Sequence, residues 1–343
     1  MLSEILAERG VPPLKSREEM LYIMQNEVYG FMPPEPQSIS FDVTANIITN
    51  FCAGKAVCSK IVANCVIAGK EFSFPFYASV PALGERHPFF VHINFRDNIP
   101  DLYLPIEEII DNGFAVLSFC YKDITSDDED FTNGLAGVLY EDSKRGSNAA
   151  GKIAMWAWGA QRVLDYAYKN PETFDLERAA VCGHSRLGKT ALLAGATDTR
   201  FKFVYSNDSG CSGAAITRKK QGETVETICK NFPYWFCKNY QKYVNNEADM
   251  PFDQHYLAAA IAPRKVLIGS ASNDLWADPE SEMLCCVAAS DAFKNGFKCE
   301  DRLPWIGDKF FKGDIGYHLR EGNHYFSRED WQRLIEFVKL HSK

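Results

Sequence analysis

The order of strand-like and helix-like segments constrains the fold of this sequence more than any other feature. From residue 87 onward, short buried apolar runs alternate with longer amphipathic segments. Such alternation is typical of a mostly parallel sheet that is covered by helices on both faces. We therefore predict an α/β protein with a three-layer αβα architecture. The expected strands are 87–95, 113–119, 178–182, 201–206, 265–269 and, more weakly, 316–319, and the expected helices include 104–112, 148–169 and 327–340.

Three further regions complete the expected organisation of a single domain over residues 1–343. Residues 1–38 contain two helical segments and a proline-rich exit, which predicts a helical brace on the main body. Residues 39–76 are rich in alternating and β-branched residues, which indicates an antiparallel start to the sheet. Residues 210–262 are aromatic and too long for a simple connection, so we predict a helical insertion that forms a cap or pocket wall.

Composition excludes several classes of protein. With 46% apolar residues the chain can bury a large core, and a net charge of -8 disfavours nucleic acid and anionic membrane surfaces as partners. Eleven cysteines without paired short spacings predict reduced thiols and no metal site. The beginning of the chain has no signal-peptide pattern, so we expect a cytoplasmic location unless a leader has been removed. The oligomeric state stays open.

The strongest motif is the segment of residues 181–191, VCGHSRLGKTA. A buried strand passes through Gly183 into Ser185 and directly into a helix, which is the context of a nucleophile elbow. The usual spacing G-x-S-x-G is not met, because Leu187 takes the place of the second glycine and Gly188 follows one residue later. The alternative is that Ser185 only caps the helix.

Chain order favours catalysis, because a serine nucleophile needs a base, and the base needs an orienting acid. In α/β-hydrolases these follow in the order Ser, Asp or Glu, His, each after a strand. Asp274 follows the strand 265–269, and His324 lies in a glycine-bounded loop before the last helix. The other candidate bases are weaker: His318 lies in or beside a strand, His341 lies near the end of the chain, and His255 begins a helix.

Two roles in the site, the acid and the oxyanion donors, have more than one candidate. Asp278 and Asp208 compete with Asp274 for the acid, although Asp278 could instead cap the helix after Pro279. The oxyanion needs two donors, and we expect the amide of Arg186 and an amide from residues 94–97. The Arg186 guanidinium is a further candidate, unless it forms only a surface salt bridge.

The elbow GHSRLGK at 183–189 resembles that of the glucuronoyl esterase family of carbohydrate esterases, which reads Gly-Cys-Ser-Arg-x-Gly-Lys. Further agreement, with the bacterial branch and its acetylxylan-esterase-like relatives, covers roughly residues 80 to 340. The motifs that carry it are WAWG at 156–159, RVLDY at 162–166, SGCSGAA at 209–215, WF at 235–236 and APR at 262–264.

The resemblance implies an α/β-hydrolase fold and cleavage of an ester on a plant-cell-wall saccharide. It places the nucleophile at Ser185, the oxyanion arginine at Arg186, a sugar-binding lysine at Lys189, a pocket tryptophan at Trp276 and the base at His324. This chain departs from the family at His184, where a cysteine is usual, and at Asp208, where fungal members carry a glutamate acid. The sugar-gripping residues of the cap do not align cleanly, and Glu223, Glu226 and Asn231 are the nearest candidates.

We therefore expect a serine carboxylic-ester hydrolase that forms an acyl-enzyme on small-molecule or oligosaccharide esters and needs neither a cofactor nor a metal. Two alternatives stay open. One is an acetylxylan or acetyl-sugar esterase of the same fold. The other is a non-catalytic α/β-hydrolase-fold binding protein.

Overall fold

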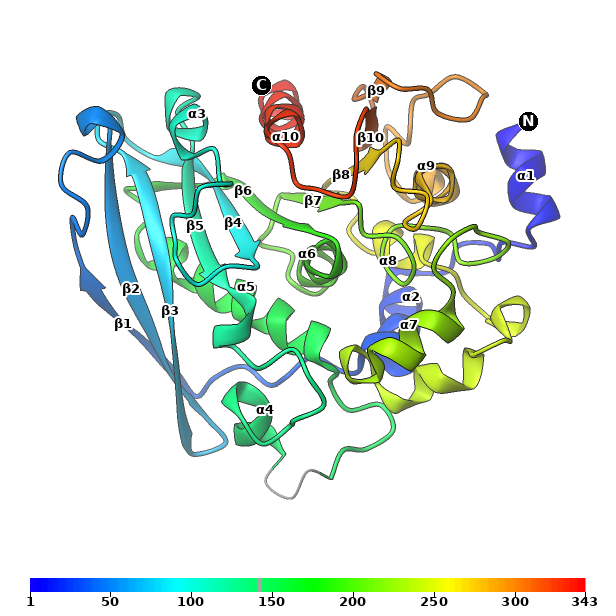
Figure 1. Ribbon diagram of the computed structural model, residues 1–343, viewed down its shortest axis with the longest axis horizontal. Coiled ribbons are helices and arrows are strands. Elements are labelled where there is room, and N and C mark those ends of the chain that lie inside the picture. Colours follow the sequence, from blue (N-terminus) through cyan, green and yellow to red (C-terminus); the bar gives the residue numbers. More distant parts are fainter. Residues whose placement is uncertain (141–143, 343) are drawn as a thin grey trace.

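One mixed sheet, with ten strands in the part of the chain that the structure describes, organises the fold (Figure 1). The structure is a computed structural model that describes residues 1–140 and 144–342. The strands lie in the order β1-β2-β3-β5-β4-β6-β7-β8-β10-β9 across the sheet. Their bounds are β1 Ser38–Thr44, β2 Ala56–Ile67, β3 Lys70–Pro81, β4 His87–Asn94, β5 Ala115–Cys120, β6 Phe174–His184, β7 Phe203–Asn207, β8 Lys265–Ala271, β9 Lys309–Phe310 and β10 Ile315–Arg320.

The centre of this sheet is parallel and its edges are antiparallel. Strands β5, β4, β6, β7, β8 and β10 pair in parallel. Strands β1, β2 and β3 form the antiparallel start that the sequence predicts, and β9 adds an antiparallel edge beside β10. The carboxyl ends of the parallel strands therefore meet along one edge, where α/β proteins place their ligands.

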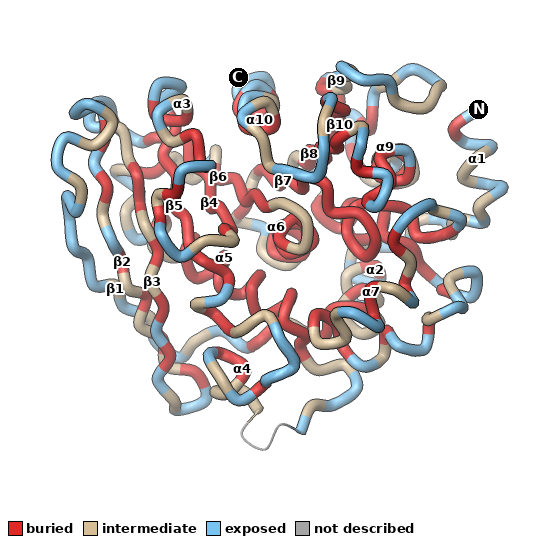
Figure 2. The backbone as a smooth tube through the Cα atoms, in the orientation of Figure 1, coloured by how far each residue is buried: buried red, intermediate tan, exposed pale blue. Residues whose placement is uncertain are grey.

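Helices cover both faces of the sheet and complete the predicted three-layer sandwich. One face packs against α3 (Ile106–Asp111) and α10 (Arg328–His341). The other face packs against α5 (Lys152–Lys169), α6 (Arg186–Thr197), α8 (His255–Ala259) and α9 (Pro279–Ala289). The short helix α4 (Gly134–Leu139) lies beside β3 and α5. Figure 2 shows that buried residues concentrate around α6 and the central strands, whereas β1 at the edge is largely exposed.

The N-terminal segment packs against helices of the main body. Helix α1 (Leu2–Glu8) contacts α9, and α2 (Arg17–Met24) contacts α8. Ser16 begins α2 with a capping box, and a single π-helical turn follows over Gln25–Tyr29. The Arg17 guanidinium donates to the carbonyl oxygens of Ala196 and Ala260, each at 2.8 Å, which ties the brace to the core.

The insertion at 210–262 has two parts with different positions. Its first part contains α7 (Val225–Asn231) and the turn Pro233–Trp235, and residues of this part line a cavity described below. Its second part contains the turns Lys238–Tyr243 and Glu247–Asp249 and ends in α8, which is buried against α2, α6 and α9. The insertion is therefore a pocket wall in its first part and a core element in its second.

One helix begins later than the sequence predicts. We expect a helix over 148–169, but α5 begins at Lys152, because the backbone before it bonds to distant segments. The Asn148 carbonyl accepts from the Phe31 amide at 3.0 Å, and the Gly151 amide donates to the Tyr29 carbonyl at 2.8 Å.

All eleven cysteines lie among the described residues as free thiols, and nine are buried. In the same part of the chain, every helix is too short or too polar to cross a bilayer.

Candidate active site

Ser185 lies on the sharp turn between β6 and α6, at the carboxyl edge of the sheet. Its backbone has φ 57° and ψ -126°, a conformation that L-residues rarely adopt. Gly183 makes this turn possible, because a Cβ atom there would lie 2.2 Å from the Leu187 carbonyl oxygen. The Ser185 side chain makes no capping hydrogen bond to α6. The geometry is that of a nucleophile elbow rather than of a helix cap.

The displaced second glycine has a packing role. A Cβ atom on Gly188 would lie 3.0 Å from both Ser206 Oγ and Ser209 Cβ, so glycine lets α6 approach the end of β7. Leu187, which stands at the usual glycine position, is fully buried.

His324 and Asp274, which lie 50 residues apart in the sequence, form a pair in the structure. The Nδ1 atom of His324 lies 2.6 Å from Oδ2 of Asp274, and the Ala277 amide donates to Oδ1 of Asp274 at 3.2 Å. Burial raises the pKa of Asp274, but the hydrogen bonds and charge of this environment outweigh burial and hold that pKa below its ordinary value. Asp274 is therefore an ionised acceptor that fixes the proton of His324 on Nδ1.

The two alternative acids serve other partners. Asp208 accepts a hydrogen bond from the Ala271 amide at 2.7 Å and lies 3.4 Å from the Arg320 guanidinium. Burial and the charge of nearby Glu282 raise the pKa of Asp208 well above its ordinary value. Asp278 caps α9 by accepting from the Ser281 amide, which is the structural alternative that the sequence left open.

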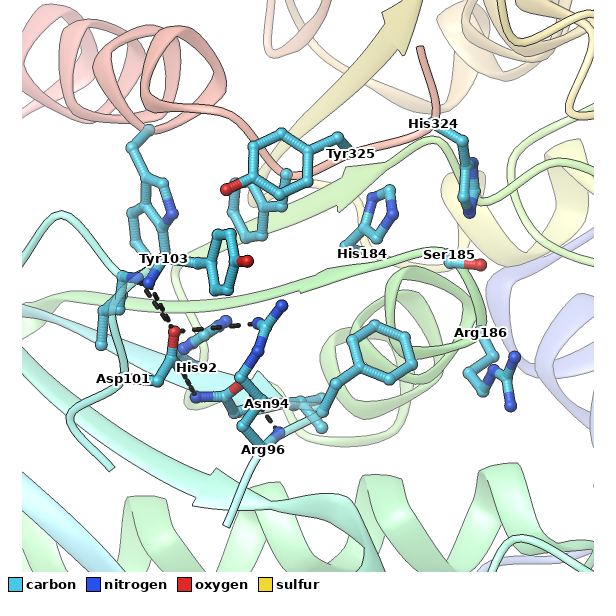
Figure 3. A pocket seen from close by; sticks show the side chains of 15 residues that line it. His92, Asn94, Arg96, Asp101, Tyr103, His184, Ser185, Arg186, His324 and Tyr325 are labelled. Carbon is cyan, nitrogen blue, oxygen red and sulfur yellow. Dashed lines mark hydrogen bonds and ion pairs between the residues drawn. The ribbon is translucent and has the colours of Figure 1, made fainter. Parts of the chain in front are cut away.

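Two cavities meet at Ser185, Arg186 and His324. The first, of about 290 Å³, is lined by Ser185, Arg186 and His324 together with the end of β4 and Tyr103 and Tyr325. Figure 3 shows Ser185, His184 and His324 at one end of this cavity and Tyr103, Asp101 and Arg96 at the other. The second, of about 340 Å³, shares Ser185, Arg186 and His324 with the first.

The second cavity is lined by Lys189 and Trp276, to which the resemblance gives substrate-binding roles, and by Glu223, one of the nearest candidates in the insertion. Lys189 and Glu223 are both buried on its wall, and Trp276, which is 54% exposed, lies at its rim. The Lys189 amine donates to the Ser209 carbonyl oxygen, and burial lowers the pKa of this amine. A buried amine and a buried carboxylate in one cavity suit a ligand with several hydroxyl groups.

Arg186 places both a backbone and a side-chain donor near Ser185. Its amide is one of the first amides of α6, which have no acceptor within the helix. Its guanidinium pairs with Asp127 and lies 4.6 Å from the ring centroid of Trp235. The Arg186 side chain is thus an inward-facing group rather than a surface salt bridge.

The segment 94–97, in which a second oxyanion donor is predicted, begins at the end of β4. Asn94, Phe95 and Arg96 line the first cavity together with Ser185. The Arg96 amide donates to Oδ1 of Asn94 at 3.2 Å, so this amide is already occupied. A donor from residues 94–97 stays a prediction.

Comparison with known proteins places this site in a family. The profile described as "Glucuronyl esterase, fungi" matches residues 64–295. The chain belongs to the glucuronyl esterase family. It is 42% identical over 240 residues to carbohydrate esterase MZ0003 of an unknown prokaryotic organism, over 69% of this chain and 55% of that protein. It is 30% identical over 290 residues to a 4-O-methyl-glucuronoyl methylesterase of Schizophyllum commune, over 81% of this chain and 67% of that protein.

Solved structures agree with this membership and with the predicted α/β-hydrolase fold. A promiscuous CE15 esterase from a marine bacterial metagenome has a TM-score of 0.85 and 31% identity, over 95% of this chain and 91% of that one. A glucuronoyl esterase from Solibacter usitatus has a TM-score of 0.85 and 29% identity, over 95% and 92%. The chain thus spans nearly the whole of these two structures but only about half to two thirds of the two curated relatives.

This chain departs from the family pattern beside Ser185 and in the insertion. His184, at the usual cysteine position, packs its ring against His324 with centroids 4.4 Å apart. Of the three candidate sugar-binding residues in the insertion, Glu223 lines the second cavity, whereas Glu226 and Asn231 are exposed and do not.

The competing histidines are structural in this glucuronyl esterase family member. His255 is buried, and its Nε2 lies 3.0 Å from the Pro12 carbonyl oxygen. His318 is buried in β10 against the Tyr205 hydroxyl, and His341 bonds the Phe311 carbonyl near the end of α10.

One group of side chains has the spacing of a metal site. Asp208, Asp274 and His324 each offer a ligand atom, and these atoms lie within 4.8 Å of one another. Each already has a partner, because Asp274 binds His324 and Asp208 binds the Ala271 amide. The donor set therefore fits an acid–base pair better than a cation.

Sequence reasoning missed the surroundings of Arg186 and of the first cavity. Asp127 and Trp235 contact the Arg186 guanidinium from distant parts of the chain, and Tyr103 and Tyr325 line the first cavity. Trp235 belongs to the WF motif at 235–236, but the sequence does not indicate its contact with Arg186. The only local signal for Asp127 was an acidic run at 123–130.

Proposed function

We propose that this chain is a serine carboxylic-ester hydrolase that cleaves 4-O-methylglucuronoyl esters of plant-cell-wall saccharides, including oligosaccharides. The observation that carries the proposal is the position of Ser185 and His324 where two cavities meet, with Asp274 bonded to His324. One cavity has buried groups for a hydroxylated acyl part, and the other leaves room for an alcohol. Membership of the glucuronyl esterase family supports the same reaction.

Acylation begins when Ser185 Oγ attacks the ester carbonyl carbon. His324 takes the Ser185 proton on Nε2, while Asp274 holds the Nδ1–H and stabilises the imidazolium that forms. His324 then gives this proton to the departing alcohol oxygen as the carbon–oxygen bond breaks. Among the described residues no hydrogen bond joins Ser185 Oγ to His324, and bound substrate must bring these two groups together.

Deacylation repeats these roles with water. His324 takes a proton from the water molecule, whose oxygen attacks the acyl carbon of the ester on Ser185. The proton passes to Ser185 Oγ as the acyl group leaves as a carboxylic acid, which ionises at neutral pH.

Arg186 stabilises the negative charge of both tetrahedral intermediates. The start of α6 directs backbone N–H groups toward the carbonyl oxygen, and the Arg186 guanidinium adds a full positive charge. A second backbone donor comes from residues 94–97 at the end of β4.

The uronate part of the ester occupies the cavity with Lys189 and Glu223. The Lys189 amine donates to sugar hydroxyl oxygens, and the Glu223 carboxylate accepts from sugar hydroxyl groups. Trp276 covers the sugar ring from the rim. The alcohol occupies the other cavity, beside Tyr103 and Tyr325.

Hydrolysis of benzyl glucuronate and methyl glucuronate by the purified protein tests the proposal. We expect turnover by the wild type and at least a thousandfold loss in Ser185→Ala, since the nucleophile is removed. Thermal unfolding of Ser185→Ala at the wild-type temperature serves as the control for folding. Equal rates for the two proteins would show that Ser185 is not the nucleophile.

The same assay separates this proposal from the acetyl-esterase alternative. A buried amine and carboxylate favour a uronate over an acetyl group, which needs only a small apolar slot. We expect kcat/KM for methyl glucuronate to exceed kcat/KM for acetylated xylo-oligosaccharides by at least tenfold. The reverse order would assign the site to acetyl esters.

A further inference from the structure

The acidic loop that follows β5 has no role in the reaction described so far. It contains four carboxylates between residues 127 and 130, and three of them, Asp128, Glu129 and Asp130, are exposed. Asp127 is different, because its side chain is only 6% exposed and points into the molecule. A buried carboxylate must be paired, so its partners indicate its role.

Three donors from three segments of the chain converge on the Asp127 carboxylate. Oδ2 accepts from the Tyr121 hydroxyl at 2.7 Å and from Nη1 of Arg186. Oδ1 accepts from Nε1 of Trp235 at 2.7 Å. The carboxylate therefore joins the loop, the first residue of α6 and the wall of the insertion.

The aromatic residues around Arg186 leave its guanidinium little freedom to move. It lies 4.6 Å from the ring centroid of Trp235, 5.5 Å from that of Phe232 and 5.6 Å from that of Phe95. The rings of Phe232 and Trp235 are themselves stacked, with centroids 3.9 Å apart. Stacking fixes the plane of the guanidinium, and the bond to Asp127 fixes its direction.

The loop that carries Asp127 is itself anchored to the core. Lys152, at the start of α5, is fully buried, and its amine donates to Thr125 Oγ1 at 3.0 Å and to the Asp130 carbonyl oxygen at 2.6 Å. Nε1 of Trp156 donates to the Thr125 carbonyl oxygen at 3.1 Å. Asp127 therefore sits on a rigid support rather than on a free loop.

We infer that Asp127 is a positioning residue that holds the Arg186 guanidinium beside Ser185, in the place where it stabilises the oxyanion. Asp127 does not line either cavity among the described residues and so does not touch the substrate, whereas Arg186, which it binds, lines both cavities beside Ser185. Preorganised charge contributes to catalysis because no reorganisation is needed when the negative charge develops. This inference rests on the role proposed above for Arg186.

The inference predicts how substitutions at Asp127 change the rate. In Asp127→Ala the guanidinium loses its fixed direction, and we expect kcat to fall by about 30-fold with KM changed less than twofold. Asp127→Asn keeps one carbonyl oxygen for Arg186 and Tyr121, so its kcat falls by less than about fivefold. Glu129→Gln removes a like charge from an exposed residue of the same loop, and its kcat stays at the wild-type value.

A double-mutant cycle separates positioning from a general structural effect. Adding Asp127→Ala to Arg186→Ala should cost less than twofold in kcat, because the group that Asp127 holds is already gone. If the two losses multiply, or if Asp127→Ala alone leaves kcat unchanged, the inference is wrong. Should Asp127→Ala fail to fold by thermal unfolding, the same cycle with Asp127→Asn decides, with a coupled loss supporting the inference and an additive one overturning it.

The substrate is chosen so that the two proposals fail separately. The cycle is measured with 4-nitrophenyl acetate, because an oxyanion forms with any ester that Ser185 attacks. A chain that hydrolyses 4-nitrophenyl acetate but no glucuronate ester would refute the proposed substrate and still allow the cycle to test Asp127.

Discussion

The Nδ1 atom of His324 lies 2.6 Å from the carboxylate of Asp274. Asp208 and Asp274 follow the neighbouring strands β7 and β8, and their order in the sequence does not show which of them binds the histidine. Asp208 instead accepts from the Ala271 amide and lies 3.4 Å from the Arg320 guanidinium. The hydrogen-bond partners therefore favour Asp274 as the acid.

Asp274→Asn should lower kcat by about a thousandfold or more, because an amide no longer fixes the tautomer of His324 or stabilises its positive charge. Asp208→Asn keeps the acceptor for the Ala271 amide, so kcat should fall less than fivefold, with a change of about 1 kcal/mol in unfolding free energy. Steady-state kinetics and urea unfolding of both variants check this. A larger kcat loss in Asp208→Asn would move the acid to the other strand.

The ring of His184 should help to orient His324. Burial lowers the pKa of His184 to about 3, so its ring is neutral, and its Nδ1 lies 2.7 Å from Oδ1 of Asn207. His184→Ala leaves a gap beside His324, and we expect kcat to fall about tenfold with KM unchanged. His184→Phe keeps a ring there and should lose less. If both variants lose the same amount, ring packing does not orient His324.

Lys189 should set the preference for a uronate. Lys189→Met has a similar volume but no donor, and we expect the ratio of kcat/KM for methyl glucuronate to kcat/KM for 4-nitrophenyl acetate to fall about 100-fold. Lys230→Met removes an exposed lysine of α7 and provides the matched control. An unchanged ratio in Lys189→Met would place the sugar elsewhere.

Glu282 should make folding stability depend on pH. It is buried, and it accepts from Ser270 Oγ at 2.6 Å and from the amide of Gly210, a residue that lines the second cavity, at 2.9 Å. Burial raises the pKa of Glu282 to about 7. The folded state thus binds the proton of the Glu282 carboxyl more tightly than the unfolded state, in which this carboxyl has its ordinary pKa of 4.5. The contribution of Glu282 to the free energy of unfolding is fully present below about pH 4.5 and is lost as pH rises through about 7. The total loss is up to about 3 kcal/mol.

Glu282→Gln removes this titration while keeping an acceptor for the Gly210 amide. Urea unfolding at pH 5 and pH 8 should therefore show a smaller loss of unfolding free energy with pH in the variant than in the wild type. Equal pH dependence in the two proteins would mean that Glu282 does not titrate in this range.

Local patterns were sufficient for much of the fold and for the sharp turn at Ser185. The strand, glycine, serine and helix of 181–191 are contiguous, so the elbow at Ser185 is predictable without tertiary information. The order of Asp274 and His324 along the chain follows from the order of the strands. The start of α5 was misplaced because its preceding backbone bonds to the distant residues Phe31 and Tyr29.

Residues that act across long sequence separations were not predictable in the same way. Asp127 lies 59 residues before Arg186, and nothing in the acidic run distinguishes it from its exposed neighbours until the fold buries it. The same holds for Glu223 and Glu226, which lie three residues apart in the sequence, although only Glu223 reaches the cavity.

Because two cavities share Ser185, the acyl part and the alcohol part of the proposed substrate occupy different spaces. In the proposed acyl-enzyme the uronate stays in the cavity lined by Lys189, and the cavity lined by Tyr103 is free once the alcohol has left. The product then depends on whether water or a second alcohol enters the cavity lined by Tyr103. An added alcohol that fits there would intercept the acyl group, and the esterase would then work as a transacylase.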